Sequence, residues 1–341
     1  MLELRFPPEH SADETHLANV RRVIANALDV QAHQGNRAAN QTIIDEIGVS
    51  VRLERDESYC KEAIDYHLGI LYAHIGEFEK AVYHFERSQT HPGSGGNQLF
   101  SDHQHDSSEL RRRQELAMQR GIPSFVIASM PRSASASLTQ TIASALDLPI
   151  MRVSSGRFPN FYLVPRWLNS FSRGGAVLHD HFGALPFNLR TLREGGVREV
   201  FVRVRDPRAA ATSAARLSNR KYGISNDTDF ENKVIQLCES SFIPWIVDWL
   251  AATQAPDTGL YIHWLLQPSN AVSEMMQCIL KELAPENPSL EQYLRADVAE
   301  ITANFDVGQE EFWRKAISGS AQERLWNATP QNVKDLLELR P

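Results

Sequence analysis

From residue 123 to residue 283, short apolar runs alternate with segments of helical spacing, and this alternation constrains the fold more than any other feature. Each apolar run is bounded by turn residues, which is typical of a strand buried on both faces. Strands that alternate with helices predict an α/β fold, with a parallel sheet flanked by helices on both faces. The expected strands are 123–129, 175–182, 199–204 and 259–265, and the expected helices are 138–146, 209–217, 231–252 and 271–283.

The N-terminal part of the chain has a different pattern, with apolar positions at helical spacing over residues 1 to about 90. Within 65–88, five positions resemble a tetratricopeptide repeat, with a turn at Gly76. A free-standing array needs about three repeats, so we expect a short α-helical extension that also includes a degenerate hairpin over 15–48. The five positions are Leu68, Gly69, Tyr72, Ala81 and Phe85.

Residues 90–107 are rich in Gly, Ser, Asp and His and predict a linker. The next helix is expected to begin near Ser107 or Ser108 and to end at Gly121. We therefore expect residues 1–106 to form the tetratricopeptide-like helical segment and linker, and residues 107–341 to form a nucleotide-binding catalytic domain. The helical segment is the part expected to contact another protein, if one binds.

The composition, 42% hydrophobic and 23% charged, excludes a mostly disordered chain. No secretory signal is visible, and no apolar run approaches the roughly 20 residues of a membrane helix. The three cysteines (Cys60, Cys238 and Cys278) are too far apart for a zinc knuckle or a disulfide framework. These features predict a reduced, cytoplasmic protein without a membrane span.

The net charge of −7 argues against general nucleic-acid binding, yet the charge is unevenly distributed. From Arg132 to Lys221 there are 14 Arg plus Lys and 5 Asp plus Glu, a balance of +9, so the rest of the chain carries −7 − 9 = −16. Clustered positive charge raises the local concentration of anions. The basic third of the chain is therefore either an anion site or a solvated basic face.

The segment 125–138, FVIASMPRSASASL, passes from a buried strand into a loop of small residues and then into a helix. Such an arrangement presents backbone N–H groups and the positive end of a helix dipole to an anion. Arg132 adds a planar cation, and the hydroxyls of Ser133, Ser135 and Ser137 add donors. The alternative is an ordinary strand-to-helix turn. The Walker pattern is missing, which disfavours an ATP-dependent kinase.

A second motif, R-D-P-R at Arg205–Arg208, follows the strand 199–204, with Ser213 in the next helix. Together with P-R-S-x-S at 131–135, it resembles the sulfotransferases that use 3′-phosphoadenosine 5′-phosphosulfate (PAPS). The two motifs are in the same order as in that family, with Arg205 73 residues after Arg132 (205 − 132). The resemblance covers residues 121–341, and a tetratricopeptide segment fused to such a domain is a familiar bacterial arrangement.

The resemblance implies a P-loop-like sulfotransferase fold that binds PAPS and releases adenosine 3′,5′-bisphosphate without a metal. The 5′-phosphosulfate would be held by the first loop, and the 3′-phosphate by Arg205 and Ser213. A C-terminal loop resembling residues 304–313 would close over the nucleotide through Val307 and Gly308. The first-loop residues are Arg132, Ser133, Ala134, Ser135, Ala136 and Ser137.

Four positions depart from the family pattern. Ala134 stands where Gly is usual, and because Ala disfavours positive φ, we expect a slightly reshaped loop. Ala136 replaces a frequent Thr, and Ser137 stands where some members have an adenine-stacking aromatic. Asp306 replaces an arginine, which puts one contact with the nucleotide phosphate in doubt.

Sulfuryl transfer to a hydroxyl needs a proton acceptor, and a histidine suits this task. In the family this histidine ends a strand between the two motifs, and GAVLHDHF at 175–182 offers His179 and His181. Two residues apart, they share one face of the strand. The strand end favours His181 as the base, with Arg132 stabilising charge on the leaving oxygen. The alternative for each histidine is a buried core residue whose ring nitrogens are hydrogen-bonded. A metal site built on the His-x-His pair is a rival, but no third ligand with suitable spacing is evident.

Residues 150–175 lie where family members build acceptor contacts, and they include Phe158, Tyr162 and Trp167. These aromatics, with His179, line a small-molecule pocket, or else they are helix packing. The expected acceptor is a small molecule with a hydroxyl or an amine. Two rival functions stay open: a phosphotransferase with Asp206 as the magnesium ligand, and a non-catalytic tetratricopeptide-type binding protein with a relic nucleotide fold.

Overall fold

The computed structural model describes residues 65, 68–73, 75–87, 108–222, 227–255, 258–266, 272–290 and 312–340. The chain divides into two compact units, residues 1–101 and residues 102–341. Several expectations lie outside the described residues: the hairpin at 15–48, the linker, the boundary at 106/107, and the loop residues Asp306, Val307 and Gly308. These stay predictions.

In the first unit, helical residues 68–73 and helix α4 (Phe78–Arg87) are joined by a turn in which Gly76 has a φ of +81°. Phe85 is fully buried, and a Cβ added at Gly69 would lie 2.7 Å from its ring. Glycine therefore permits this close approach of the two segments. That the unit is a tetratricopeptide repeat stays a prediction.

In the second unit, five parallel strands form a sheet in the order β2-β5-β1-β6-β7. The predicted parallel sheet is confirmed, and the four expected strands are all present. Only β2, two residues long, was not expected. The strands are β1 (Phe125–Ser129), β2 (Ile150–Met151), β5 (Val177–Asp180), β6 (Glu199–Arg203) and β7 (Tyr261–Leu265).

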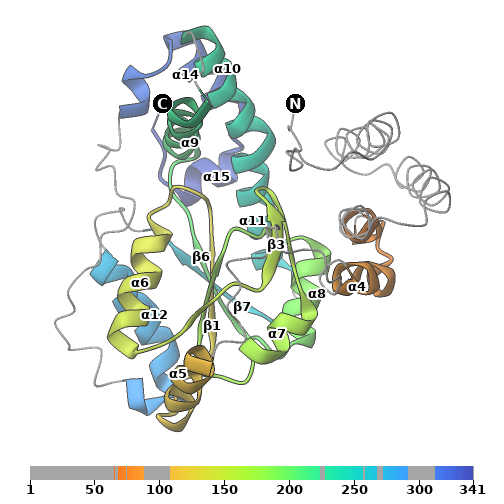
Figure 1. Ribbon diagram of the computed structural model, residues 1–341. Helices are drawn as coiled ribbons and strands as arrows, with labels where there is room; N and C mark the ends of the chain where they lie inside the picture. The colour runs from red at the N-terminus through yellow and green to blue at the C-terminus, as the bar shows by residue number, and fades with distance from the viewer. Residues whose placement is uncertain are drawn as a thin grey trace, which may run out of the picture. The chain divides into compact units, whose positions relative to one another are not determined.

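Helices cover both faces of the sheet (Figure 1). Phe125 and Ile127 of β1 pack on one face with α5 (Ser108–Gln119), α6 (Ser135–Leu146) and α12 (Val272–Leu283). Val126 and Ala128, which alternate with them, pack on the other face. The helices of that face are α7 (Pro165–Phe171), α8 (Pro186–Glu194), α9 (Pro207–Tyr222) and α11 (Ile243–Gln254).

Two parts of the second unit differ from the sequence expectations. Residues 154–163 form an antiparallel hairpin of β3 (Ser154–Arg157) and β4 (Asn160–Leu163). The single helix expected over 231–252 is instead α10 (Asp227–Leu237), a π-helical turn (Cys238–Phe242) and α11. Pro244 has no N–H for the carbonyl of residue 240, and its ring would clash with that carbonyl, so the helix widens just before it.

Of the C-terminal segments, the first packs on α9, the second on α10 and the π-helical turn, and the third on α11. They are the 3₁₀ turn Phe312–Lys315, α14 (Gly319–Ala328) and α15 (Gln331–Leu336); two further 3₁₀ turns, Ala284–Glu286 and Pro288–Leu290, follow α12. The guanidinium of Arg208, at the start of α9, lies 4.3 Å from the ring centre of Trp313 and 5.6 Å from that of Trp326. These cation–π contacts attach the C-terminal segments to α9.

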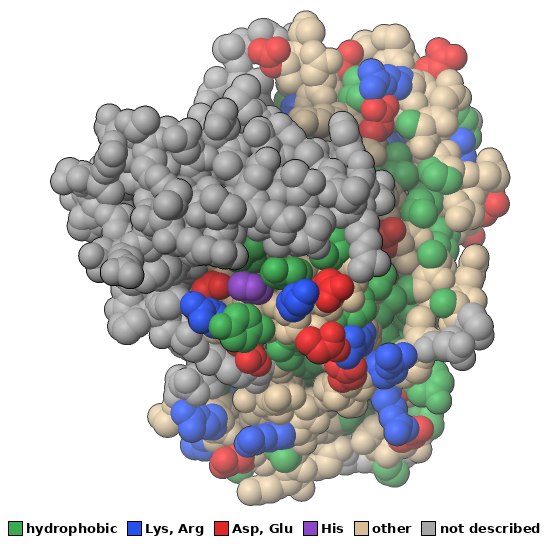
Figure 2. All heavy atoms as spheres, turned by 90° about the vertical axis from the view of Figure 1, so that its right-hand side faces the viewer, with side chains coloured by type: hydrophobic (Ala, Val, Ile, Leu, Met, Phe, Trp, Pro, Cys, Tyr) green, Lys and Arg blue, Asp and Glu red, His purple; other side chains and the backbone are tan. Residues whose placement is uncertain are grey.

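No helix within the described ranges combines the length and the apolar character that crossing a membrane requires. On the face shown in Figure 2, acidic and basic side chains of the described residues are interspersed, so positive charge does not gather there.

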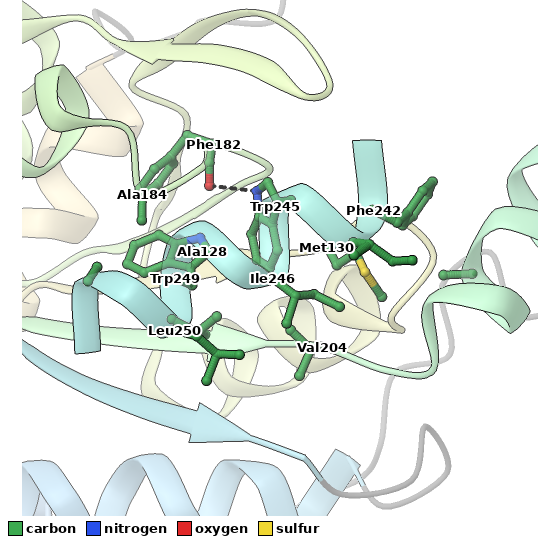
Figure 3. Packing of buried hydrophobic residues seen from close by; sticks show 14 of the residues in the cluster. Ala128, Met130, Phe182, Ala184, Val204, Phe242, Trp245, Ile246, Trp249 and Leu250 are labelled. Atoms are coloured by element: carbon green, nitrogen blue, oxygen red, sulfur yellow. Dashed lines mark hydrogen bonds between the residues drawn. The ribbon is translucent and has the colours of Figure 1, made fainter. Parts of the chain in front are cut away.

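Aromatic residues of α11 pack beneath the carboxyl ends of β1 and β6 (Figure 3). Trp245 and Trp249 belong to the same buried cluster as Met130 and Val204, the residues that follow these two strands. The indole N–H of Trp245 donates to the carbonyl of Phe182 at 3.1 Å. This packing holds the strand ends, and hence the loops that follow them, in fixed positions.

Candidate functional site

The candidate site lies at the carboxyl ends of β1, β5 and β6. Helix α6, which follows β1, covers one face of the sheet, whereas α8 and α9, which follow the neighbouring strands, cover the other. The loops after adjacent strands therefore diverge, and open α/β sheets bind their ligands at such points.

The loop after β1 has an unusual backbone. Arg132 and Ala134 both take left-handed conformations, with φ of +67° and +62°. Ala134 is the N-cap of α6, and its side chain makes no capping hydrogen bond with the amides of the first turn. The positive end of the helix dipole thus faces the loop, as in anion sites of proteins. Ala134 thus adopts the conformation that favours glycine, at a cost in strain. Whether the loop is reshaped relative to the family stays a prediction.

The serine hydroxyls of this loop are less available than the sequence suggested. Ser133 is fully buried, and its hydroxyl donates to the carbonyl of Met130 at 2.6 Å. Ser135 and Ser137 are also buried. The backbone amides are therefore the main donors that this loop offers to an anion.

The two sequence motifs meet in space. A terminal nitrogen (Nη1) of Arg205 donates to the carbonyl of Arg132 at 3.1 Å, although 73 residues separate them. The Nε of Arg132 donates to the hydroxyl of Ser213 at 2.9 Å. Three residues expected to bind one nucleotide from two separate motifs are thus in direct contact.

Arg203, the last residue of β6, also contacts the loop, and sequence reasoning missed it. Its side chain is fully buried, and its Nε donates to the carbonyl of Ser133 at 2.9 Å. A sequence signal was present, because an arginine interrupts the otherwise apolar end of the strand 199–204.

Two histidines lie beside the loop, on the same side of β5 as expected. His181 follows the last residue of β5, and its Nδ1 lies 2.8 Å from the carbonyl oxygen of Ser129, the last residue of β1. The Nε2 of His179 lies 3.0 Å from the hydroxyl of Ser129. The two imidazole ring centres are 5.5 Å apart.

The hydrogen bonds indicate the protonation state of His181. The hydroxyl of Ser129 also lies 3.1 Å from this Nδ1. Because a carbonyl oxygen only accepts, the shorter contact requires a hydrogen on Nδ1, which the hydroxyl can accept as well; in the neutral ring Nε2 then carries the lone pair. Burial lowers the pKa of His181, and the nearby Asp180 opposes this only in part. Burial also lowers the pKa of His179, to about 3. Both imidazoles are therefore neutral at neutral pH, and His181 is in the form that can accept a proton.

Asp180 lies between the two histidines in the sequence, and its carboxyl group accepts two hydrogen bonds. One carboxyl oxygen accepts the backbone N–H of His181 at 2.9 Å, and the other accepts the hydroxyl of Ser154 from β3. Burial raises the pKa of this carboxyl. The contacts join the hairpin β3–β4 to the end of β5.

The hairpin separates the aromatics that the sequence grouped. Tyr162 is buried, and its ring centre lies 6.0 Å from that of Phe187 in α8. The neighbouring Phe161 points the other way, with its ring 6.1 Å from that of His181. The ring centre of Phe158 lies 5.0 Å from that of Phe242 in the π-helical turn. Trp167, on α7, is partly buried against the core.

The carboxylate of Asp206, the magnesium ligand that a phosphotransferase would use, is paired with Arg208. Both carboxyl oxygens of Asp206 accept hydrogen bonds from Arg208, at 3.0–3.2 Å to its guanidinium. That pairing neutralises the carboxylate which the phosphotransferase reading requires. Within the described part of the chain, no three His, Cys, Asp or Glu side chains lie together as metal ligands would.

Phe312 and Trp313, the last two residues of the segment expected to close over the nucleotide, lie in a 3₁₀ turn. Arg216 of α9 lies over the ring of Phe312 at 4.5 Å, and Arg208 lies over Trp313. Because α9 also carries Ser213, this end of the segment is attached to the helix expected to bind the 3′-phosphate.

No protein-family model matches the chain, and no curated protein sequence matches it. Among solved structures, one match is the crystal structure of a mouse sulfotransferase, SULT7A1, complexed with PAP. It has a TM-score of 0.33 and 12% identity, over 63% of this chain and 82% of that chain. The functional assignment therefore depends on the geometry of this chain's own residues.

Proposed function

We propose that residues 107–341 form a sulfotransferase domain that transfers a sulfuryl group from PAPS to a small-molecule acceptor. The observation that carries the proposal is the contact between the two motifs: Arg205 with the carbonyl of Arg132, and Arg132 with Ser213. A donor with phosphate at both the 5′ and 3′ positions needs two anion sites at a fixed separation, and two adjacent motifs of this composition supply them.

The 5′-phosphosulfate end is assigned to the loop after β1. The left-handed residues Arg132 and Ala134 and the uncapped start of α6 support an anion held by the amides of residues 133–137. The 3′-phosphate is assigned to Arg205 and Ser213. Because the Nε of Arg132 is engaged with Ser213, the terminal nitrogens of Arg132 are assigned to the charge that develops on the leaving oxygen.

The general base is His181, acting through Nε2. When bound, PAPS supplies the sulfuryl group: the bond from sulfur to the phosphate oxygen breaks, and a bond from sulfur to the acceptor oxygen forms. The acceptor's proton passes to Nε2 of His181, which the carbonyl of Ser129 keeps in the required tautomer through Nδ1–H. His179 instead supports the cluster through the hydroxyl of Ser129.

The acceptor is assigned to the side of His181 that Phe161 approaches, with Phe158 beside it. Tyr162 and Trp167 are assigned to packing. A hydroxyl is the group that a neutral imidazole serves best as base, and an amine is the alternative acceptor.

The test is sulfuryl transfer from isotopically labelled PAPS to a panel of small hydroxyl and amine compounds. His181→Ala should abolish transfer while binding of adenosine 3′,5′-bisphosphate is retained. His263→Ala is the matched control, because His263 is also partly buried but pairs with Glu199 at the opposite end of β6. Retained transfer in His181→Ala would contradict the assignment of the base.

A further inference from the structure

A positive charge is buried directly behind the proposed phosphate loop. Arg203 has 0% exposure, and its side chain leaves β6 on the same face as Phe201, the face covered by α6 and α12. A guanidinium keeps its charge even when buried. Burying that charge costs free energy that an apolar side chain of similar volume would not.

The contacts of Arg203 join three strand ends. Besides the bond from Nε to Ser133, Nη1 donates to the carbonyls of Val204 and Leu265 at 2.8 and 2.9 Å. Ser133 lies in the loop after β1, Val204 follows β6, and Leu265 ends β7. One side chain therefore fixes the loop relative to two strands of the sheet.

The bond to Ser133 determines where the next amide points. In a trans peptide the C=O and the N–H point in opposite directions. Because Arg203 holds the carbonyl of Ser133 on its own side, the N–H of Ala134 points away from Arg203. The left-handed conformation of Ala134 begins at this same peptide, so the contact with Arg203 helps to offset its strain.

The positive charge of Arg203 should favour an anion at the loop, as the orientation of the Ala134 N–H does. A cation in the low-dielectric interior attracts an anion more strongly than the same cation in water. An anion bound by the loop would have the amides of residues 134–137 next to it and the guanidinium of Arg203 behind them.

We propose that Arg203 is a positioning residue for the 5′-phosphate: it orients the Ser133–Ala134 peptide and supplies positive charge behind the loop. This inference rests on the proposed function. It predicts that loss of Arg203 selectively weakens ligands that carry a 5′-phosphate, an effect that a purely structural role would not produce.

The experiment compares Arg203→Met and Arg203→Lys with the unaltered protein. The ligands are adenosine 3′,5′-bisphosphate, adenosine 5′-phosphate and adenosine 3′-phosphate, measured by calorimetry or by displacement. Arg203→Met should weaken the two ligands with a 5′-phosphate by roughly tenfold to a hundredfold, the range for a hydrogen bond to a charged group. Adenosine 3′-phosphate should bind unchanged. Arg203→Lys keeps the charge but not the planar fork, and should show a smaller loss.

The control is Val200→Ala, on the same strand but with its side chain on the opposite face. It should lower thermal stability without changing the preference among the three ligands. Equal weakening of all three ligands by Arg203→Met, or no weakening, would overturn the inference. If Arg203→Met does not fold, Arg203→Lys decides by the same preference. If the unaltered protein binds none of the ligands, the proposed function itself fails.

Discussion

Replacing Ala134 by Gly should stabilise the protein, although glycine usually destabilises. Ala134 has a φ of +62°, in the left-handed region that glycine adopts without a steric penalty. The substitution removes only a methyl group, so it isolates the backbone strain of the loop.

The expected magnitude follows from two opposing effects. A left-handed conformation costs an L-residue about 1–2 kcal/mol, which glycine recovers. Glycine also gives the unfolded chain more freedom, which costs about 0.4–1 kcal/mol. The net expectation for Ala134→Gly is a gain of about 0–1.6 kcal/mol in the free energy of unfolding, with a midpoint of about 0.8 kcal/mol.

The matched control is Ala136→Gly, two residues further on and inside the first turn of α6. There the backbone is helical, so glycine should cost about 0.5–1 kcal/mol. Urea denaturation of both variants, with equal slopes, measures the difference. If the two glycines destabilise equally, Ala134 is not in a strained conformation, and the account of the loop is wrong.

Three further predictions concern the residues around the loop. Arg205→Ala should weaken adenosine 3′,5′-bisphosphate by about 2–4 kcal/mol in calorimetry, because it removes a charged partner of the 3′-phosphate; unchanged affinity would remove Arg205 from the site. Because burial lowers the pKa of His181, the loss of kcat/KM on acidification should occur below pH 6.5, the ordinary value of a histidine; a midpoint at or above that value would contradict a buried neutral base. With the pKa of His179 lowered to about 3, the folded protein binds fewer protons than the unfolded chain between about pH 3 and 6.5. The free energy of unfolding is therefore fully present above that window and falls as the pH falls through it. In urea denaturation, His179→Gln should reduce the drop in stability between pH 7 and pH 4.5. An unchanged drop would show that His179 does not cause it.

Much of the fold could be predicted because buried parallel strands are continuous apolar runs. The strands at 123–129 and 199–204 were predicted, and so was α6, the first helix between them. Helices α7 and α8, which also lie between these strands in the chain, were not predicted. Strand β2 is too short to leave a pattern. The hairpin at 154–163 pairs a polar strand, Ser154–Arg157, with an aromatic one, and neither strand alternates clearly.

The resemblance of the two motifs to the sulfotransferases assigned Arg132, Arg205 and Ser213 to one nucleotide. The structure brings these residues into contact, and their binding of a nucleotide stays a prediction. The sequence could not indicate which way the individual side chains point. The inward hydroxyl of Ser133 and the choice of Phe161 over Tyr162 both depend on backbone geometry and strand register, which residue types do not encode.

The contacts of Arg203 could not be predicted from the sequence either. A lone arginine in an apolar strand indicates a buried polar contact, but the partner cannot be read from the sequence. Here it is a carbonyl that is 70 residues away along the chain.

The central claim is that the two motifs bind one doubly phosphorylated adenosine. Isothermal titration of the unaltered protein with adenosine 3′,5′-bisphosphate, with and without magnesium, tests it most directly. The account predicts tight binding that magnesium does not alter. Binding that requires magnesium would point to phosphoryl transfer, and no binding in either buffer would contradict the claim.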